Sequence, residues 1–305
     1  MKKILCLLIV VILFTGCGEK EIKDKNIKIA VSIVPQETFV KAVAGDLVSV
    51  TVLIPPGNSP ANYQPSPKQM IDFNEADIYF SIGVPTEKAN IIPQIEENNK
   101  IKHIDLAKKV SEEYDDRFFG DNHEEDNHEE DNNENIEEEH NHKNARDPHI
   151  WLSPKRVKVM IKEIEKSLIE IDPNNKEIYE KNAKEYIAKL DNLDLEIKNI
   201  FLEQEKTKFI TYHPSFGYFA DDYGLEMIAV EINGKEVTPK ILKEVIDLAL
   251  KEDIKCILYQ KEFDQNQARI VAEEIDGKVI EMEPLSKEYI SNLKKMARAI
   301  SDNMN

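Results

Sequence analysis

The sequence predicts an α/β protein with two lobes, each built on a mostly parallel sheet, joined by a long rigid helix. Short apolar runs alternate with helical patterns in both halves of the 305-residue chain, and such alternation is typical of parallel sheets covered by helices. Between the halves, one helical pattern of about 30 residues would extend about 45 Å, which exceeds the span of a ~100-residue lobe. We therefore expect this helix to act as a strut between the lobes.

The first lobe is expected over residues 27–172. Short apolar runs, rich in β-branched residues at the start, predict its strands at 27–34, 48–54, 78–82 and 101–106. Helical patterns predict helices at 36–44, 67–74 and 154–170. Ser153 suits the N-cap of the last of these helices and Pro154 its first turn, whereas Pro55-Pro56-Gly57 must form a loop.

The linking helix is expected over residues 173–205, after the start signal Asp172-Pro173, and the second lobe over 206–305. Thr238 and Asp264 are N-cap signals in this lobe. Its strands are predicted at 208–212, 226–232, 254–260 and 278–281. Its helices are predicted at 215–223, 239–251, 265–275 and 287–302.

The first residues read as an export signal followed by a lipid anchor. Two lysines precede an apolar run at 4–14, which is too short to span a bilayer. The following segment, LFTGC, resembles a bacterial lipobox, so residues 1–16 are expected to be removed and Cys17 to be lipidated. Residues 17–26 would then tether the protein to the outer face of the cytoplasmic membrane. A location in the periplasm is the alternative. The alternative is an ordinary signal peptide with a chance cysteine.

Most of the negative charge lies in one segment. The net charge is −18, and residues 111–147 hold 16 acidic and 3 basic residues. A strongly acidic chain disfavours nucleic acid and anionic lipid as partners. Because the segment is too polar to bury much surface, we expect a disordered loop. Its four histidines, interleaved with carboxylates, favour weak metal collection over a loop that only solvates: His123, His128, His140 and His142.

Two other histidines stand where loops meet regular structure. His149 lies in DPHIWLSP, just before a helix cap, and His213 lies in FITYHPSFGYF, at the end of a predicted strand. Ligands of open α/β sheets bind at the carboxyl ends of strands, although a single histidine there is more often structural. The sequence contains no HExxH, GxSxG, Walker or CxxC motif. We therefore expect a binding protein rather than an enzyme.

Taken together, four stretches resemble the substrate-binding proteins of ABC importers for zinc and manganese. They are AVSIVPQETFVKAVAGDLVSVTVLIPPG, DPHIWLSP, YHPSFGYFADDYGL and EMEPLSKEYISNLKKMA, with a His-rich acidic insertion before the second. The resemblance covers residues 27–300 and implies two α/β lobes bridged by a rigid helix, with the metal in the cleft between them. It implies His149 and His213 as ligands, one from each lobe, and Glu283 as the carboxylate ligand.

The first ligand of that family is missing here. The family commonly has Pro-His-x-Tyr after its Pro-Gly loop, whereas this sequence has Ala61, which lacks a donor atom, between Pro60 and Asn62. The three remaining protein ligands leave one position of a tetrahedral ion open. The candidates for the fourth ligand are water, Asn62, Gln64 and a histidine of the acidic loop.

The resemblance implies a monomeric extracytoplasmic protein that captures a transition-metal ion and delivers it to the permease of an ABC importer. Two imidazoles and a carboxylate suit Zn²⁺ better than a hard cation, and Mn²⁺ is the alternative cargo. A binding protein of similar build for a metal chelate is a second alternative. An exported zinc hydrolase or a surface adhesin ranks below these, because the sequence shows no general base or substrate pocket.

Overall fold

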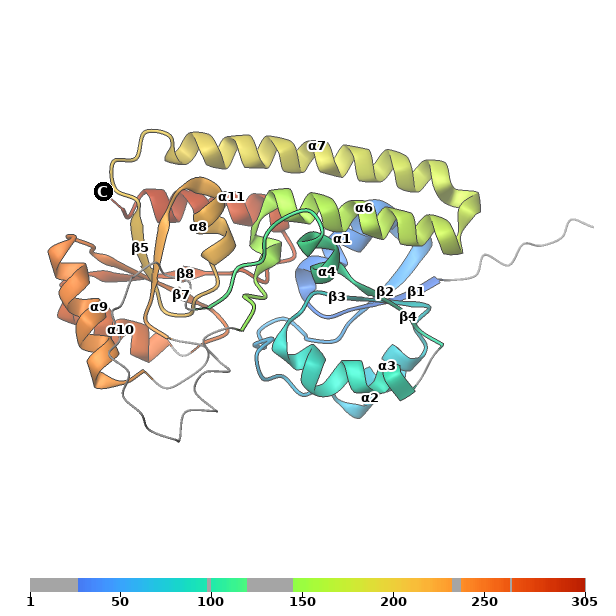
Figure 1. The fold of residues 1–305 in the computed structure, drawn as a ribbon, viewed down its shortest axis with the longest axis horizontal. Helices are drawn as coiled ribbons and strands as arrows, with labels where there is room; N and C mark the ends of the chain where they lie inside the picture. The colour runs from blue at the N-terminus through green and yellow to red at the C-terminus, as the bar shows by residue number, and fades with distance from the viewer. Residues whose placement is uncertain (1–26, 98–99, 120–144, 232–236, 264, 305) are drawn as a thin grey trace, which may run out of the picture.

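Two four-stranded parallel sheets form the centres of two lobes in the computed structural model (Figure 1). The structure describes residues 27–97, 100–119, 145–231, 237–263 and 265–304. The strand orders are β2-β1-β3-β4 and β6-β5-β7-β8, and every neighbouring pair is parallel, which confirms the predicted fold class. The strands are β1 (Ile27–Val31), β2 (Val48–Val52), β3 (Ile78–Ser81), β4 (Lys102–Asp105), β5 (Lys208–Thr211), β6 (Glu226–Ala229), β7 (Cys256–Gln260) and β8 (Lys278–Met282).

Helices cover both faces of the first sheet. Its helices are α1 (Val34–Ala44), α2 (Pro67–Asn74), α3 (Ile92–Glu97), α4 (Leu106–Ser111) and α6 (Pro154–Ile171). Figure 1 shows α1 and α6 on one side of the sheet and α2 and α3 on the other. Strand β1 is buried on both faces, because Ile29 and Val31 point into the main core while Ala30 between them joins a second apolar cluster with Phe73. A continuous apolar strand is what a parallel sheet with two covered faces requires.

The second lobe repeats this arrangement. Its helices are α8 (Gly217–Tyr223), α9 (Pro239–Lys251), α10 (Gln265–Glu274) and α11 (Tyr289–Ser301). Residues of α9 and α10 share one apolar cluster with β5 and β7. Thr238 caps α9 as predicted, since its side chain accepts a hydrogen bond from the Ile241 N–H.

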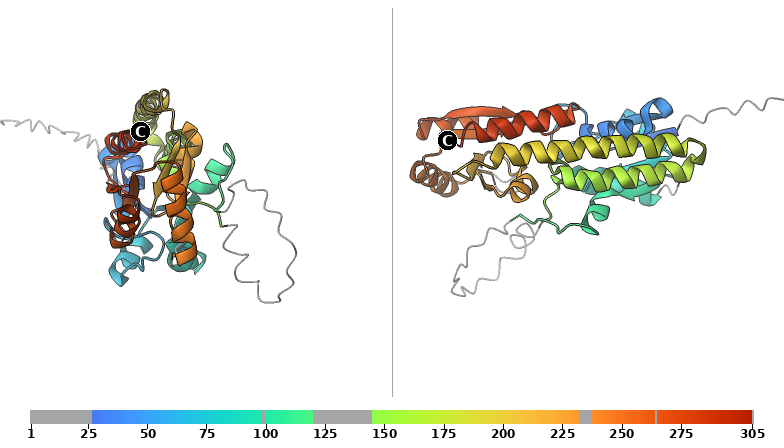
Figure 2. Two further views of the ribbon diagram at one scale, coloured as in Figure 1. Left: turned by 90° about the vertical axis from the view of Figure 1, so that its left-hand side faces the viewer. Right: turned by 90° about the horizontal axis from the view of Figure 1, so that it is seen from above.

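Helix α7 (Lys176–Phe201) joins the lobes. Its 26 residues correspond to about 39 Å, and it packs against α1 and α6 of the first lobe and against α8 and α11 of the second. The second view of Figure 2 shows it lying along both lobes. Its buried residues recur at intervals of three or four: Tyr179, Ala183, Tyr186, Leu190, Leu193, Ile197 and Phe201. Because one apolar core runs along this face into both lobes, the helix is a rigid strut, as predicted.

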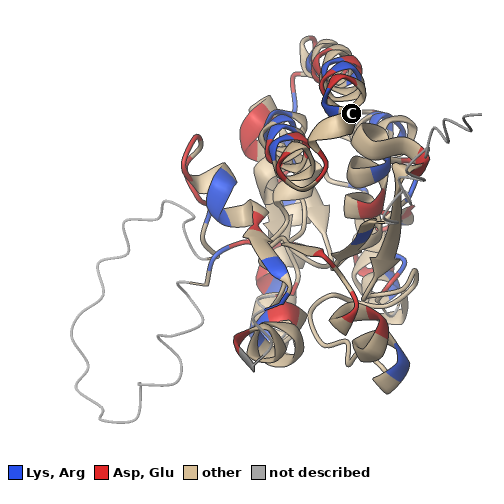
Figure 3. Ribbon diagram, turned by 90° about the vertical axis from the view of Figure 1, so that its right-hand side faces the viewer, with Lys and Arg blue, Asp and Glu red and all other residues tan. Residues whose placement is uncertain are grey.

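Several predicted features lie outside the described residues. They are the export signal, Cys17 and the tether in residues 1–26, and the four loop histidines in residues 120–144. The two ends of the acidic segment are described, however, and they pair through an antiparallel bridge between Phe118 and Arg146. No helix within the described ranges is both long and apolar enough to cross a membrane. Figure 3 shows basic and acidic residues interspersed along the helices of the two lobes.

Candidate metal centre

A cleft of about 900 Å³ lies between the lobes, beyond the carboxyl ends of the strands. The first lobe contributes residues 57–62, which follow β2, the turn 83–85, which follows β3, and His149 with its neighbours. The second lobe contributes Tyr212 and His213 after β5 and Gln260 with its neighbours at the end of β7. In open α/β sheets this is the edge at which ligands bind. Both histidines that the sequence analysis singled out therefore reach the same cleft.

Asp147 holds His149 in place. Its Oδ1 atom accepts hydrogen bonds from His149 Nδ1 at 2.7 Å and from the His149 backbone N–H at 2.9 Å. The Asp147 side chain is fully buried, and His149 is 7% exposed. The ring of Trp151 packs beside the imidazole, with ring centroids 5.1 Å apart. A carboxylate on Nδ1 keeps the proton on that nitrogen and leaves the Nε2 lone pair free for a ligand.

His213 has a matching environment in the second lobe. Its Nδ1 atom lies 3.1 Å from Glu231 Oε2, and its ring stacks on Phe263 with centroids 4.4 Å apart. Burial lowers the pKa of His213, against the opposing effect of Glu231. The imidazole therefore stays neutral at physiological pH, and its Nε2 lone pair also faces the cleft.

The two imidazoles converge on one point. Their Nε2 atoms are 3.3 Å apart, whereas the ring centroids are 5.2 Å apart, so the nitrogens occupy the facing edges of the pair. Two nitrogens bound at about 2.0–2.1 Å to one tetrahedral ion lie roughly 3.4 Å apart. When Nδ1 of each ring carries the proton shared with its carboxylate, two lone pairs face each other at this distance, and a cation between them makes the contact favourable.

The structure does not bring Glu283 to this pair. Its carboxylate forms an ion pair with Lys261 at 2.9 Å and is not among the cleft-lining residues of the described chain. Ala61 and Asn62 line the cleft, whereas Gln64 is absent from the described lining. Across the described ranges, no three His, Cys, Asp or Glu side chains are grouped so that they would hold an ion. The described residues therefore supply two protein ligands to an ion, His149 and His213.

The carboxylates that orient the imidazoles were missed by the sequence analysis. Asp147 stands two residues before His149, so the Asp-Pro-His motif carried a local signal. Glu231 follows β6 and contacts His213, which lies 18 residues earlier in the chain. The only sequence signal for this contact was the position of Glu231 near the end of a predicted strand. His103, the remaining described histidine, stays in the first sheet, where its Nε2 atom lies 2.8 Å from Ser81 Oγ.

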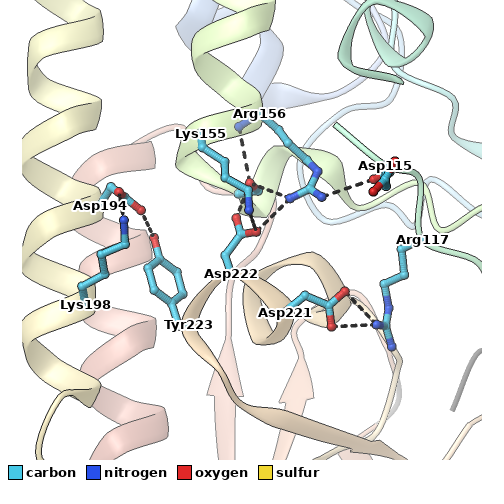
Figure 4. A network of polar contacts seen from close by, with 10 residues as sticks. Asp115, Arg117, Lys155, Arg156, Asp194, Lys198, Asp221, Asp222 and Tyr223 are labelled. Carbon is cyan, nitrogen blue, oxygen red and sulfur yellow. Dashed lines mark hydrogen bonds and ion pairs between the residues drawn. The ribbon is translucent and has the colours of Figure 1, made fainter. Parts of the chain in front are cut away.

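Ion pairs between α8 and the first lobe join the two lobes (Figure 4). Arg117 Nη1 lies 2.9 Å from both carboxylate oxygens of Asp221. Asp222, whose side chain is 3% exposed, pairs with Lys155 at 2.5 Å and with Arg156 at 2.9 Å. Both aspartates belong to α8 of the second lobe, whereas their partners lie in or before α6 of the first lobe. The network fixes α8 against the first lobe.

A second contact between the lobes runs through Trp151. Its indole N–H donates to the carbonyl of Pro284 at 2.9 Å, and Tyr289 Oη donates to the Trp151 carbonyl at 2.8 Å. Trp151 is 1% exposed and packs beside His149. The position of the His149 ring is therefore coupled to the second lobe even without a bound ion.

Comparisons with known proteins identify relatives of this chain. Residues 29–303 match the family described as zinc-uptake complex component A, periplasmic. The chain is 32% identical over 306 residues to the high-affinity zinc uptake system protein ZnuA of Bacillus subtilis, covering 94% of this chain and 90% of that protein. It is 29% identical over 279 residues to the manganese ABC transporter substrate-binding lipoprotein PsaA of Streptococcus mitis, covering 89% and 84%.

The fold agrees with a solved structure as well. A crystal structure of a ZnuA deletion mutant with zinc bound superposes with a TM-score of 0.79 at 33% identity, covering 92% of this chain and 98% of that one. The chain belongs to the zinc-uptake component A family, whose members are substrate-binding proteins of ABC metal-uptake systems and not enzymes.

Proposed function

We propose that this protein captures Zn²⁺ between His149 and His213 and delivers it to the permease of an ABC importer. The observation that carries the proposal is the pair of Nε2 atoms, 3.3 Å apart, each with its Nδ1 atom bonded to a carboxylate. Because the two ligands come from different lobes, the bound ion stabilises the closed arrangement of the cleft. The ZnuA relative is a high-affinity zinc uptake system protein.

Manganese is the second candidate cargo, because the PsaA relative is a manganese ABC transporter substrate-binding lipoprotein. Two imidazole ligands favour Zn²⁺, since Mn²⁺ prefers oxygen ligands and stands lowest in the affinity order of the divalent first-row metals. Glu283 would add an oxygen ligand only if its carboxylate exchanged Lys261 for the ion. The described geometry thus favours zinc.

Export and a lipid anchor complete the proposal. Removal of residues 1–16 and lipidation of Cys17 would hold a monomer on the outer face of the membrane, beside its permease. The lipobox-like segment supports this, as does the lipoprotein description of the PsaA relative. The loop histidines His123, His128, His140 and His142 would collect ions weakly.

Metal titration of the purified protein tests the proposal. Calorimetry with Zn²⁺ should give one tight site in the wild type, with Mn²⁺ binding more weakly at the same site. His149→Ala and His213→Ala should each abolish that site, whereas His103→Gln, the matched control outside the cleft, should keep it. Tight zinc binding by the His149→Ala and His213→Ala double variant would refute the assignment.

A further inference from the structure

Asp147, the carboxylate that orients His149, uses only one of its two oxygens for hydrogen bonds. Its Oδ1 atom accepts two hydrogen bonds from His149, whereas its Oδ2 atom accepts none from the described residues. The side chain is fully buried, and a buried carboxylate needs a cation or further donors to offset its loss of water. Arg117 supplies that cation, because its Nε atom lies 3.5 Å from Asp147 Oδ2. No other lysine or arginine of the described ranges forms an ion pair with Asp147.

The main chain also holds Arg117 beside Asp147. The Asp147 N–H donates to the Arg117 carbonyl at 2.8 Å, and the Arg117 N–H donates to Tyr218 Oη at 2.9 Å. Gly217 leaves room for both side chains, because a Cβ atom there would lie 2.7 Å from Asp147 Oδ2 and closer still to the Arg117 side chain. The two main-chain hydrogen bonds do not use the guanidinium, so a substitution of the Arg117 side chain tests the ion pair while they remain.

The same guanidinium reaches the second lobe. Its Nη1 atom lies 2.9 Å from both carboxylate oxygens of Asp221 in α8 (Figure 4). Because α8 begins four residues after His213, Asp221 belongs to the segment that follows the second histidine. The Asp221 side chain is 50% exposed, whereas that of Asp147 is fully buried, so water and salt screen the pair with Asp221 more strongly. Arg117 therefore contacts both the carboxylate that orients His149 and the segment that carries His213.

We propose that Arg117 is a positioning residue of the metal site, which fixes the Asp147 carboxylate and, through it, the His149 imidazole. The cation holds Asp147 Oδ2, so that Oδ1 stays directed at His149 Nδ1 and the His149 Nε2 atom stays directed at His213. Without the guanidinium, the carboxylate is a buried charge with one unpaired oxygen and is free to turn toward water. The ring then loses its fixed direction, and a metal site loses affinity when the outer partner of a ligand moves. This inference rests on the proposed zinc site and adds a residue that acts only through Asp147.

Zinc affinities of variants at position 117, measured by competition with a zinc chelator, test the inference. Arg117→Met removes the cation and keeps a long side chain, and it should weaken zinc binding about tenfold, the lower end of the effect of losing an outer partner. Arg117→Lys keeps a cation beside Asp147 and should recover most of that loss. Asp221→Asn removes the charged partner in the second lobe and leaves Arg117 beside Asp147, so its affinity should stay close to the wild type. Equal losses in Arg117→Met and Asp221→Asn would mean that Arg117 only joins the lobes, and the inference would be wrong.

A double-mutant cycle separates positioning from a general loss of stability. Asp147→Asn leaves no charged carboxylate for Arg117 to hold, so adding Arg117→Met to it should change zinc affinity little. Urea denaturation checks that each variant is folded, and Arg117→Gln, which also removes the charge, takes the place of Arg117→Met in the cycle if that variant does not fold. If the two losses of binding free energy simply add, Arg117 acts elsewhere; the inference is then wrong and the zinc site stands. If the wild type binds no zinc, the proposed function itself is wrong.

Discussion

His149 Nε2 and His213 Nε2 lie 3.3 Å apart across the boundary between the lobes, although 64 residues separate them in the chain. The Nδ1 atom of each ring pairs with a carboxylate of the same lobe: His149 with Asp147, and His213 with Glu231. The long helix α7 and the ion pairs of α8 keep the lobes close before any ion binds. Capture then requires only small movements of the cleft loops.

Asp147→Asn should lower zinc affinity about 10–100-fold, the usual effect of losing a carboxylate that orients a metal-bound histidine. The amide that replaces the carboxylate no longer supplies a charged acceptor for His149 Nδ1. Competition with a chromophoric zinc chelator measures the change. Asp221→Asn, at a half-exposed carboxylate in the ion pair with Arg117, is the control and should change affinity much less. Equal losses in the two variants would contradict the orienting role of Asp147.

Gly217→Ala should destabilise the protein by about 1–3 kcal/mol, as overpacking does. A Cβ atom at this position would lie 2.2 Å from Arg117 Nε and 2.7 Å from Asp147 Oδ2. Chemical denaturation measures the loss of stability, and zinc affinity should fall with it because Asp147 must move. Removing the Arg117 side chain in a double variant should recover part of the stability, since the two changes share one contact. Strict additivity of the two changes would contradict this.

Asp222→Ala should cost about 3–5 kcal/mol of stability, because it leaves Arg156 buried without its carboxylate. The pair lies at the junction of the lobes, so the melting transition should also broaden. Asp191→Ala is a matched control. It removes an exposed ion pair with Lys158, which is worth at most about 1 kcal/mol. A similar loss in both variants would mean that the Asp222 network does not hold the lobes together.

Glu87 should make stability depend on pH. Its carboxylate accepts the backbone N–H groups of Ile82 at 2.8 Å and Gly83 at 2.7 Å, beneath the cleft turn 83–85. Burial, opposed by these hydrogen bonds, raises the pKa of Glu87 from 4.5 to about 7. Between those values the folded protein keeps a proton that the unfolded chain has lost, so stability falls as pH rises.

Glu87→Gln cannot ionise, and the comparison with it isolates this effect. The stability of the wild type relative to the variant should fall by about 3 kcal/mol between pH 4.5 and pH 7. Urea denaturation of both proteins across this range measures it. A constant difference between the two would mean that Glu87 has an ordinary pKa.

Much of the fold was predictable, because its signals are local. Apolar runs marked all eight strands of the described residues, and the spacing from Tyr179 to Phe201 marked the linking helix. Helices α3 and α4, six residues each, were missed, because so short a segment shows too little of the helical period. The helix Glu87–Ile91 was missed for the same reason, although it positions the cleft turn.

The site was predictable only in part. His149 and His213 were identified by their places at loop and strand ends, and the structure brings them together. The pairing of Glu283 with Lys261 depends on two strands lying side by side, which no local pattern reveals. Gln260 and Glu262 line the cleft but follow an apolar run, so they give no sequence signal of their own.

X-ray absorption spectroscopy at the zinc edge, on the zinc-loaded protein, tests the central claim most directly. Two imidazole nitrogens at about 2.0–2.1 Å are expected in the wild type, one in His149→Ala or His213→Ala loaded at high zinc, and two in His103→Gln. A wild-type spectrum without imidazole, or an unchanged spectrum in the His149→Ala and His213→Ala double variant, would contradict it.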